Sequence, residues 1–311
     1  MRRRQRGVAV VTALLLTTLA VTIVASLFWQ QQVQVRSMEN QRLQLQTRWI
    51  VRGALDLSRL VLFQDYIDTQ NQAYTQLGGI WATPLEETRL DDYIERERAE
   101  AENFNATLSG RMIDAQSRYN LANLAENGQP KPKEVLLFER LLTNLRLDPS
   151  LAQAVARQVA DAQPVQPQQQ GQQSVPAKVI GLMRVEDLLA VSGFTPQTIE
   201  KLRDFVIVLP KRTKLNANTV SAELMSAMMD KMSMSDAAAM VNTRKRAYYR
   251  DKPNFDALLP TGLTALADYD VNSNFFLAYS RVRLDRAALD TQSLLERATN
   301  GITTVVWIRE N

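Results

Sequence analysis

The longest run of hydrophobic residues in the chain lies near its N-terminus, between Val8 and Trp29. This segment of 22 residues contains no charged residue and no proline. A helix of that length spans roughly 33 Å, enough to cross a hydrocarbon core of about 30 Å. Its threonines and its serine are tolerated in lipid, because their hydroxyls can donate to the helix's own carbonyls. The pattern therefore predicts a transmembrane helix over residues 8–29.

A helical pattern continues beyond this run to about residue 63. The segment contains no proline and one glycine, Gly53. Its apolar positions recur at helical spacing and define one face, which we expect to comprise Leu43, Ile50, Ala54, Leu57 and Val61. One continuous helix over 8–63 would place its first half in lipid and its second half against a folded domain. Two helices with a break near residues 30–36 are the alternative.

Strand patterns flank a long helical region. One begins near residue 106, and two more follow residue 265, where apolar and small side chains alternate from Phe276 to Leu284 and a turn at Asn300-Gly301 precedes the last run. The pattern predicts an α+β fold in which one sheet packs on the long helix. We expect its first part at 30–118, an inserted α-helical domain at 119–265, and C-terminal strands at 266–311. The Gln- and Pro-rich stretch 162–177 reads as a mobile loop.

The composition of the chain excludes many kinds of active site. The chain contains no cysteine and no histidine, so a Cys/His zinc site, a cysteine nucleophile and a Ser-His-Asp triad are excluded. It has only 11 glycines and lacks the glycine motifs of nucleotide-binding folds. No catalytic constellation stands out, and an enzyme would have to use carboxylates, lysine, tyrosine or an oxygen-ligated metal.

The charge is concentrated at the N-terminus. Four arginines within the first six residues account for the whole formal net charge of +4, so the rest of the chain is neutral overall. Bulk charge therefore gives no reason to expect nucleic-acid binding. By the positive-inside rule these arginines stay in the cytoplasm, and the chain after Trp29 lies on the other side of the membrane.

The position of Gly7 distinguishes three kinds of leader. This glycine lies between the basic residues and the apolar run, so a cut after Gly7 would remove the charges and leave Val8 as the new N-terminus. A cleaved signal peptide and an uncut signal anchor are the alternatives. The arrangement resembles the class III leader of type IV pilins and type II secretion pseudopilins. The resemblance implies that a prepilin peptidase cuts the Gly7–Val8 bond and N-methylates Val8.

Further residues narrow the resemblance to the minor pseudopilin K family of type II secretion. The usual glutamate at the fifth mature position is replaced by Thr12, a departure that this family shares. The stretch 215–224 is also similar to the family's helical insert. Two further elements match the family. The Trp-Ala-x-Pro element consists here of Trp81, Ala82 and Pro84, and the element that follows it contains Asp114, Arg118, Asn120, Leu121 and Leu124. We expect Asp114 and Arg118 to form an ion pair at a strand–helix junction.

This resemblance implies a type IV pilin-like fold with a large inserted α-helical domain, and a role without catalysis. The family member would sit in the inner membrane as a single-pass protein with a periplasmic body. It would form the tip of the pseudopilus with the I and J minor pseudopilins, and with H, and help to initiate assembly for the export of folded proteins. A signal-anchored periplasmic enzyme or sensor is the alternative. A nucleic-acid module is disfavoured, because the hairpin at Ser192-Gly193-Phe194 lacks a second glycine.

A calcium site is a weaker expectation. Asp268, Asp270, Asn272 and Asn274 alternate in a way that suits oxygen ligation of calcium, although the pattern lacks the glycine and the downstream glutamate of an EF-hand. Turn-capping side chains explain the same pattern. The family resemblance implies calcium binding in the periplasmic part, as a structural ion and not as a required cofactor.

Overall fold

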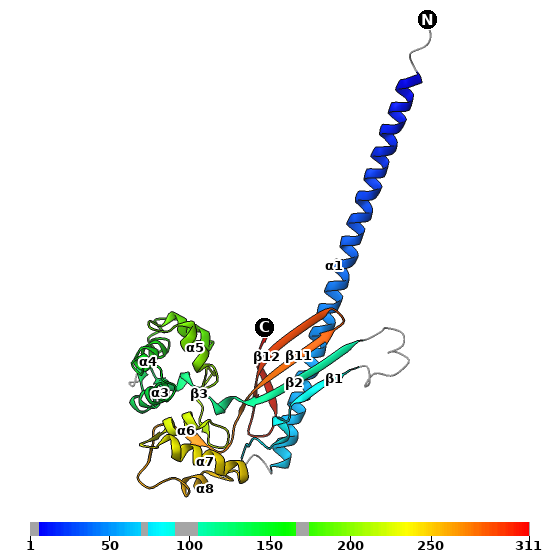
Figure 1. Ribbon diagram of the computed structural model, residues 1–311. Coiled ribbons are helices and arrows are strands. Elements are labelled where there is room, and N and C mark those ends of the chain that lie inside the picture. The colour runs from blue at the N-terminus through cyan, green and yellow to red at the C-terminus, as the bar shows by residue number, and fades with distance from the viewer. Residues whose placement is uncertain (1–5, 70–73, 91–104, 166–173, 311) are drawn as a thin grey trace.

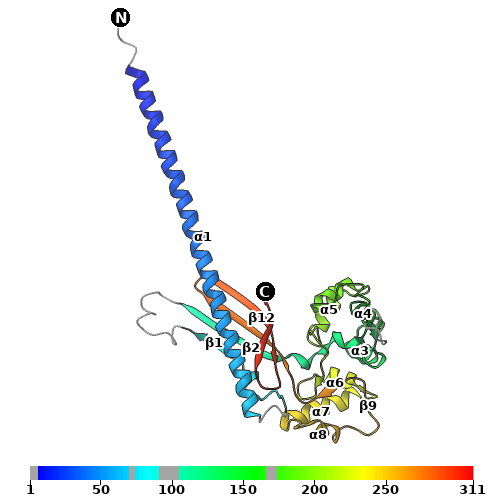
Figure 2. The same ribbon diagram turned by 180° about the vertical axis from the view of Figure 1, so that it is seen from behind.

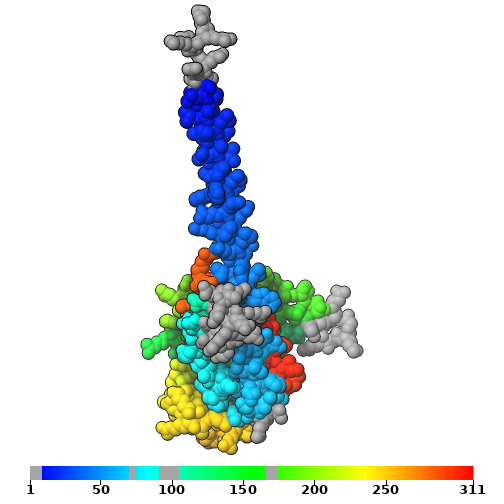
Figure 3. Space-filling model, turned by 90° about the vertical axis from the view of Figure 1, so that its right-hand side faces the viewer, coloured from blue at the N-terminus to red at the C-terminus, as the bar shows by residue number. Residues whose placement is uncertain are grey.

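The computed structural model describes residues 6–69, 74–90, 105–165 and 174–310, with the side chains of residues 6–8 left aside. A single helix, α1 (Arg6–Asp68), begins the chain and projects far beyond the folded body (Figure 1). The prediction of one continuous helix is therefore confirmed, and there is no break near residues 30–36. The space-filling view shows the first half of α1 as a bare rod (Figure 3).

The C-terminal half of α1 packs on an antiparallel sheet of five strands in the order β1-β2-β11-β12-β13. Strand β2 pairs with β11 over nine residues, so segments far apart in the sequence form the middle of one sheet, as predicted. A short 3-10 helix, η1, precedes the first strand. The bounds are η1 (Ile80–Ala82), β1 (Leu85–Arg89), β2 (Ala106–Asp114), β11 (Phe275–Leu284), β12 (Ala287–Arg297) and β13 (Thr303–Glu310).

The face of α1 that meets the sheet overlaps the predicted one: Ala54 is buried, and Ile50 and Val61 pack against the same cluster. Leu57, expected on the buried face, is 43% exposed, whereas Leu62 is completely buried. The helix is turned so that the buried positions are Thr47, Val51, Ala54, Leu55, Leu62 and Asp65. The prediction was wrong for Leu57 because α1 carries large apolar residues on its outer side as well, so hydrophobic spacing alone could not give the centre of the buried face.

The residues between β2 and β11 form the predicted large insert (Figures 1 and 2). In both views α3, α4 and α5 lie together in one lobe and α6, α7 and α8 in another. The elements of the first lobe are η3 (Ala115–Ser117), β3 (Tyr119–Asn120), η4 (Leu121–Leu124), β4 (Ala125–Glu126), β5 (Gln129–Pro130), α3 (Pro132–Asn144), α4 (Leu151–Asp161), η5 (Val185–Ala190), α5 (Pro196–Leu202) and β6 (Val206–Ile207). Those of the second lobe are β7 (Leu215–Asn216), α6 (Ala222–Met228), β8 (Met229–Asp230), α7 (Met234–Arg246), α8 (Lys252–Asp256), β9 (Thr264–Ala265) and β10 (Tyr269–Asp270).

Local sequence explains where the insert's short helices begin. The side chains of Thr195, Ser221, Ser233 and Asp251 each accept a hydrogen bond from a backbone N–H three residues later, which caps α5, α6, α7 and α8. Inside, one apolar cluster runs through both lobes and includes Met225, Met228, Met229, Met232 and Met240. The two lobes therefore share one core, with methionine as filler.

Of the Gln- and Pro-rich stretch predicted to be mobile, residues 166–173 lie outside the described residues. The ends of that stretch are joined by backbone hydrogen bonds between Val165 and Val175.

Candidate functional site

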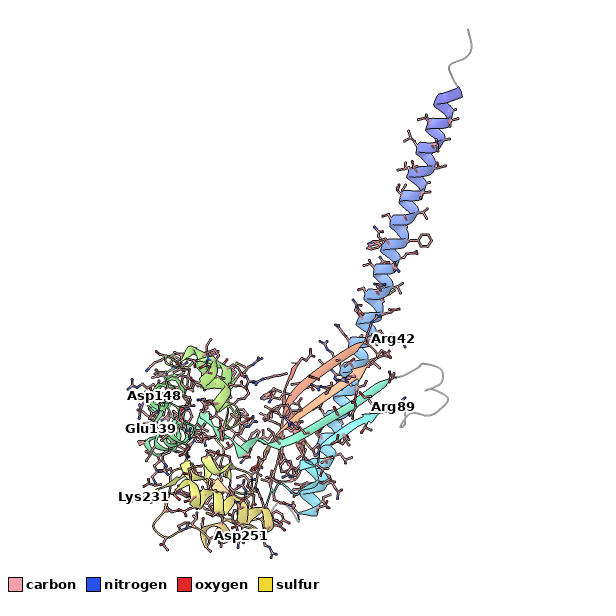
Figure 4. The ribbon with its side chains drawn as sticks, viewed as in Figure 1. Arg42, Arg89, Glu139, Asp148, Lys231 and Asp251 are labelled. Carbon is pink, nitrogen blue, oxygen red and sulfur yellow. The ribbon has the colours of Figure 1, made fainter. Side chains whose placement is uncertain are left out.

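The exposed half of α1 is the first candidate site, because its composition differs from that of a soluble helix. The most apolar stretch of the helix has a mean hydropathy of 2.3, and none of that stretch is buried. By length and composition it can cross a membrane. Figure 4 shows its side chains radiating freely, out of contact with the body. Burial in a bilayer would remove this apolar surface from water.

The processing residues lie at the start of this helix. α1 begins at Arg6, so Gly7 and Val8 belong to its first turn, and residues 1–5 of the predicted leader lie outside the described residues. The hydroxyl of Thr12 donates to the carbonyl of Ala9 at 3.0 Å. Thr12 therefore satisfies its own polar group within the helix and brings no charge into the apolar segment. Cleavage and methylation at Gly7–Val8 stay predictions.

A buried polar junction joins the sheet to the insert, and Asp114 lies at its centre. The Asp114 carboxylate accepts hydrogen bonds from the hydroxyls of Thr219 at 2.6 Å and Ser273 at 2.7 Å. It also accepts from the Asn216 amide and the backbone N–H of Gln116, both at 2.8 Å. Burial raises the pKa of Asp114, while these donors oppose the shift. One side chain at the end of β2 thus fixes the insert and the segment that leads into β11.

The expected ion pair between Asp114 and Arg118 does not form. Arg118 instead contacts Asp204, with 3.3 Å between Nη2 and Oδ1. The prediction was wrong because Asp114 points into the buried junction, where neutral donors surround it, whereas Arg118 lies at the edge of the insert beside α5. The two residues are close together along the chain, but the sequence could not show that their side chains point in different directions.

A second buried pair connects α1 to the same junction. Arg297 of β12 is completely buried, and its Nη1 lies 2.8 Å from the Asp65 carboxylate. The guanidinium also donates to the Leu62 carbonyl at 3.0 Å and to the Thr75 hydroxyl at 3.3 Å, and it lies over the Phe276 ring. Burial raises the pKa of Asp65, and Arg297 opposes that shift.

Sequence analysis missed the residues of this second pair. Asp65 follows Leu62 by three positions on the buried face of α1, so a correct choice of face would have marked it as a polar residue in an apolar stripe. Arg297 gives no such signal, since it lies at the end of a strand.

The Asn-Ala-Asn motif that resembled the family's insert is structural. The Asn216 amide donates to Asp114 and to the Thr75 carbonyl, and Asn218 exchanges two 2.8 Å hydrogen bonds with the Tyr249 backbone. Ser221 then caps α6. These residues hold the second lobe of the insert against the junction.

The structure distributes the calcium candidates over different contacts. The Asp270 carboxylate accepts from Lys214 at 2.8 Å, and the Asn274 amide donates to the Arg297 carbonyl at 3.0 Å. Asp268 is exposed, but its charge helps to raise the pKa of Glu134. Within the described ranges, no three Asp or Glu side chains are grouped so that they could hold a metal. The calcium site stays a prediction.

Glu134 is the most perturbed carboxylate of the insert. It is buried at the start of α3, where the Tyr119 hydroxyl donates to it at 3.0 Å. Burial raises its pKa to about 7, and the charges of Arg212 and Lys131 limit the shift. This carboxyl belongs to the buried interior of the insert.

Comparison with known proteins places these features in a family. Two family models described as "Type II secretion system (T2SS), protein K" match residues 117–211 and 215–272, which span most of the insert. A type II secretion system protein K from Pseudomonas aeruginosa is 28% identical over 97% of this chain and 91% of its own length. The chain belongs to the type II secretion system protein K family.

Other relatives agree with this assignment. The protein K of Aeromonas hydrophila is 24% identical over 94% of this chain and 92% of its own. Among solved structures, a chain in the crystal structure of the GspK–GspI–GspJ complex from enterotoxigenic Escherichia coli matches with a TM-score of 0.61 and 18% identity. The match covers 89% of this chain and 99% of that chain. It confirms the predicted fold, a pilin-like helix and sheet with a large insert.

Proposed function

We propose that this chain is a minor pseudopilin that forms the tip of the periplasmic pseudopilus and helps to initiate its assembly, without catalysing a reaction. The observation that carries the proposal is the position of the insert. The insert lies at the end of the molecule remote from the N-terminus and extends sideways from the sheet (Figures 1 and 2). A second subunit stacked beyond that end would collide with it, whereas subunits below could still pack along α1.

The apolar first half of α1 supports a location in the inner membrane. The apolar stretch would hold the chain in the inner membrane before assembly, with the arginines of residues 2–6 in the cytoplasm and the body in the periplasm. Prepilin peptidase would cut after Gly7 and methylate Val8. Because Thr12 carries no carboxylate, a subunit at the tip would bury no unpaired charge in the packed helices.

The I and J minor pseudopilins are the partners we propose, with H as a further contact. The structural relative from E. coli was solved as a complex with GspI and GspJ. Co-purification tests the proposal. The full-length chain, the I and J subunits and the prepilin peptidase of the same system are produced together, and a tag on protein K is used for capture in detergent. We expect I and J to elute with protein K in fixed ratio, and capture of protein K alone would contradict the proposal.

A further inference from the structure

A polar cleft lies between the insert and the face of the sheet that α1 leaves uncovered. Its volume is about 500 Å³, which is within the range of ordinary ligand pockets. Strands β2, β11, β12 and β13 form one wall, and the opposite wall comes from residues 183–186 and 203–208 of the insert. In Figure 1, the lobe that contains α5 stands beside β12 and the C-terminal end, on the side of the sheet away from α1. The cleft has no part in the helix packing proposed above.

The lining of this cleft is strongly basic. Seven charged residues contribute to it, and five of these are arginines; the seven are Arg111, Arg118, Arg184, Arg203, Arg309, Glu186 and Asp204. Arg118 is paired with Asp204 at 3.3 Å, and Arg203 with Glu186 at 3.4 Å. The two acids of the cleft are therefore already used by two of its arginines.

The other three arginines of the cleft have no acidic partner in the part of the chain that the structure describes, since no ion pair within 4.0 Å involves Arg111, Arg184 or Arg309. Arg111 lies near the face of the Tyr279 ring. Three arginines around one cavity thus form no ion pair within the described residues, and the nearby carboxylates of Glu186 and Asp187 act on Arg309 only without direct contact.

Arg309 is held in place at the junction of the two walls. Its Nη2 donates to the Met183 carbonyl of the insert at 2.8 Å, and its guanidinium lies 3.9 Å from the centre of the Trp307 ring. Partial burial and the nearby charge of Arg184 lower the pKa of Arg309, and the charges of Glu186 and Asp187 oppose that shift. Arg184 and Arg309 therefore repel each other, and an anion bound between them would relieve the repulsion.

We propose that this cleft binds a carboxylate-rich segment of another polypeptide. The arginine fork matches a carboxylate through two parallel hydrogen bonds. The arginines come from separate elements around the cavity, so they suit several carboxylates spaced along a chain better than one compact phosphate, which needs donors converging on a point. Between them the lining offers the half-buried rings of Trp307 and Tyr279, against which a peptide can pack, and the Gln292 amide donates a 2.9 Å hydrogen bond to the Tyr279 hydroxyl.

The test uses the purified full-length chain in detergent, without the I and J subunits, so its result is independent of the proposed place at the tip. The probe is a fluorescent peptide in which glutamate alternates with glycine, and anisotropy measures its binding. A peptide with glutamine at the same positions is the matched probe. We expect saturable binding of the glutamate peptide, at least about tenfold weaker binding of the glutamine peptide, and marked weakening when salt is raised from about 0.05 to 0.5 M.

The site is assigned by substitution. Arg111→Gln with Arg184→Gln removes two of the cleft's positive charges and should weaken peptide binding by about tenfold or more. Arg157→Gln with Lys231→Gln removes the same charge from exposed positions that do not line the cleft, and should change binding less than about twofold. Lys231 is labelled on the outer margin of the insert in Figure 4. Circular dichroism confirms that each variant is folded.

Three outcomes would overturn the proposal. The first is the absence of saturable binding at low salt. The second is equal binding by the cleft variant and the wild-type chain, which would place the peptide elsewhere. The third is displacement of the peptide by an equal concentration of inorganic phosphate, which would make the cleft a site for a small anion instead of a polypeptide.

Discussion

At the scale of single residues, Asp65 and Arg297 form an ion pair that is almost completely buried. Both side chains are removed from water, so each charge depends on the other and on the hydrogen bonds around it. The pair also joins three parts of the chain, since Arg297 contacts α1, the loop at Thr75 and the ring of Phe276. Loss of either side chain should therefore weaken the contact between α1 and the sheet.

Replacing Arg297 by methionine tests this role. Arg297→Met leaves the Asp65 carboxylate buried without its counter-ion, and we expect a loss of about 3–5 kcal/mol in the free energy of unfolding at neutral pH. Urea denaturation followed by tryptophan fluorescence can measure it, because Trp81 is buried against Phe276. Arg281→Met breaks an exposed pair with Asp290 and should cost less than about 1 kcal/mol. Equal losses in the two variants would show that burial of the pair is unimportant.

The raised pKa of Glu134 predicts that the free energy of unfolding depends on pH. Its pKa is about 7 in the folded chain and 4.5 in the unfolded chain, so the folded state holds the proton more tightly. The stabilisation that comes from this proton is fully present below pH 4.5 and is lost as the pH rises to about 7. The free energy of unfolding changes by up to about 3 kcal/mol over that interval.

The variant Glu134→Gln keeps the shape of the side chain but cannot ionise. We therefore expect it to match the wild-type chain near pH 4.5 and to be more stable above pH 7, with the difference growing across that interval. Urea midpoints measured across the pH range give this difference directly. A difference that did not change with pH would contradict the raised pKa.

At the scale of elements, the choice of face on α1 decides which leucines matter. Leu62 is completely buried against the sheet, whereas Leu60 is 62% exposed although it is only two positions away. Leu62→Ala should destabilise the body by about 2–5 kcal/mol, because it leaves a cavity between helix and sheet. Leu60→Ala should change the free energy of unfolding of the isolated chain by less than about 0.5 kcal/mol. The same urea measurement compares them, and a larger loss for Leu60→Ala would contradict the observed orientation of α1 on the sheet.

The sequence was sufficient to predict the secondary-structure elements but not the contacts between them. The length of α1 and the sheet built from both ends of the chain follow from hydrophobic periodicity, which is a local property. The orientation of α1 depends on which of two apolar faces meets the sheet, and that is decided by the partner strands. The partner of Arg118 was predicted wrongly for the same reason, since Asp204 comes close only when the insert folds back. The Asp65–Arg297 pair joins residues 232 positions apart, beyond the reach of any local pattern.

At the scale of the whole molecule, the apolar rod and the body are two parts with different surroundings. The body satisfies its polar groups through the junction at Asp114 and the shared core of the insert. The rod has no such partners in the isolated chain, and its apolar surface must be covered by lipid or by neighbouring helices. The first half of α1 therefore needs surroundings that the folded body does not provide.

Processing at Gly7 is the prediction that links the rod to assembly. In cells that contain prepilin peptidase, we expect intact-mass spectrometry of the purified full-length chain to show an N-terminus at Val8 with one added methyl group. Gly7→Val places a branched side chain at the bond to be cut, so the leader should remain. The body lies far from residue 7, and its unfolding by urea should be unchanged in this variant, which separates failed processing from misfolding. With the arginines retained, the uncut chain should stay in the membrane fraction and should no longer be captured with the I and J subunits. A wild-type chain that begins at Met1 under these conditions would identify the rod as an ordinary signal anchor and remove the basis for its place in a pseudopilus.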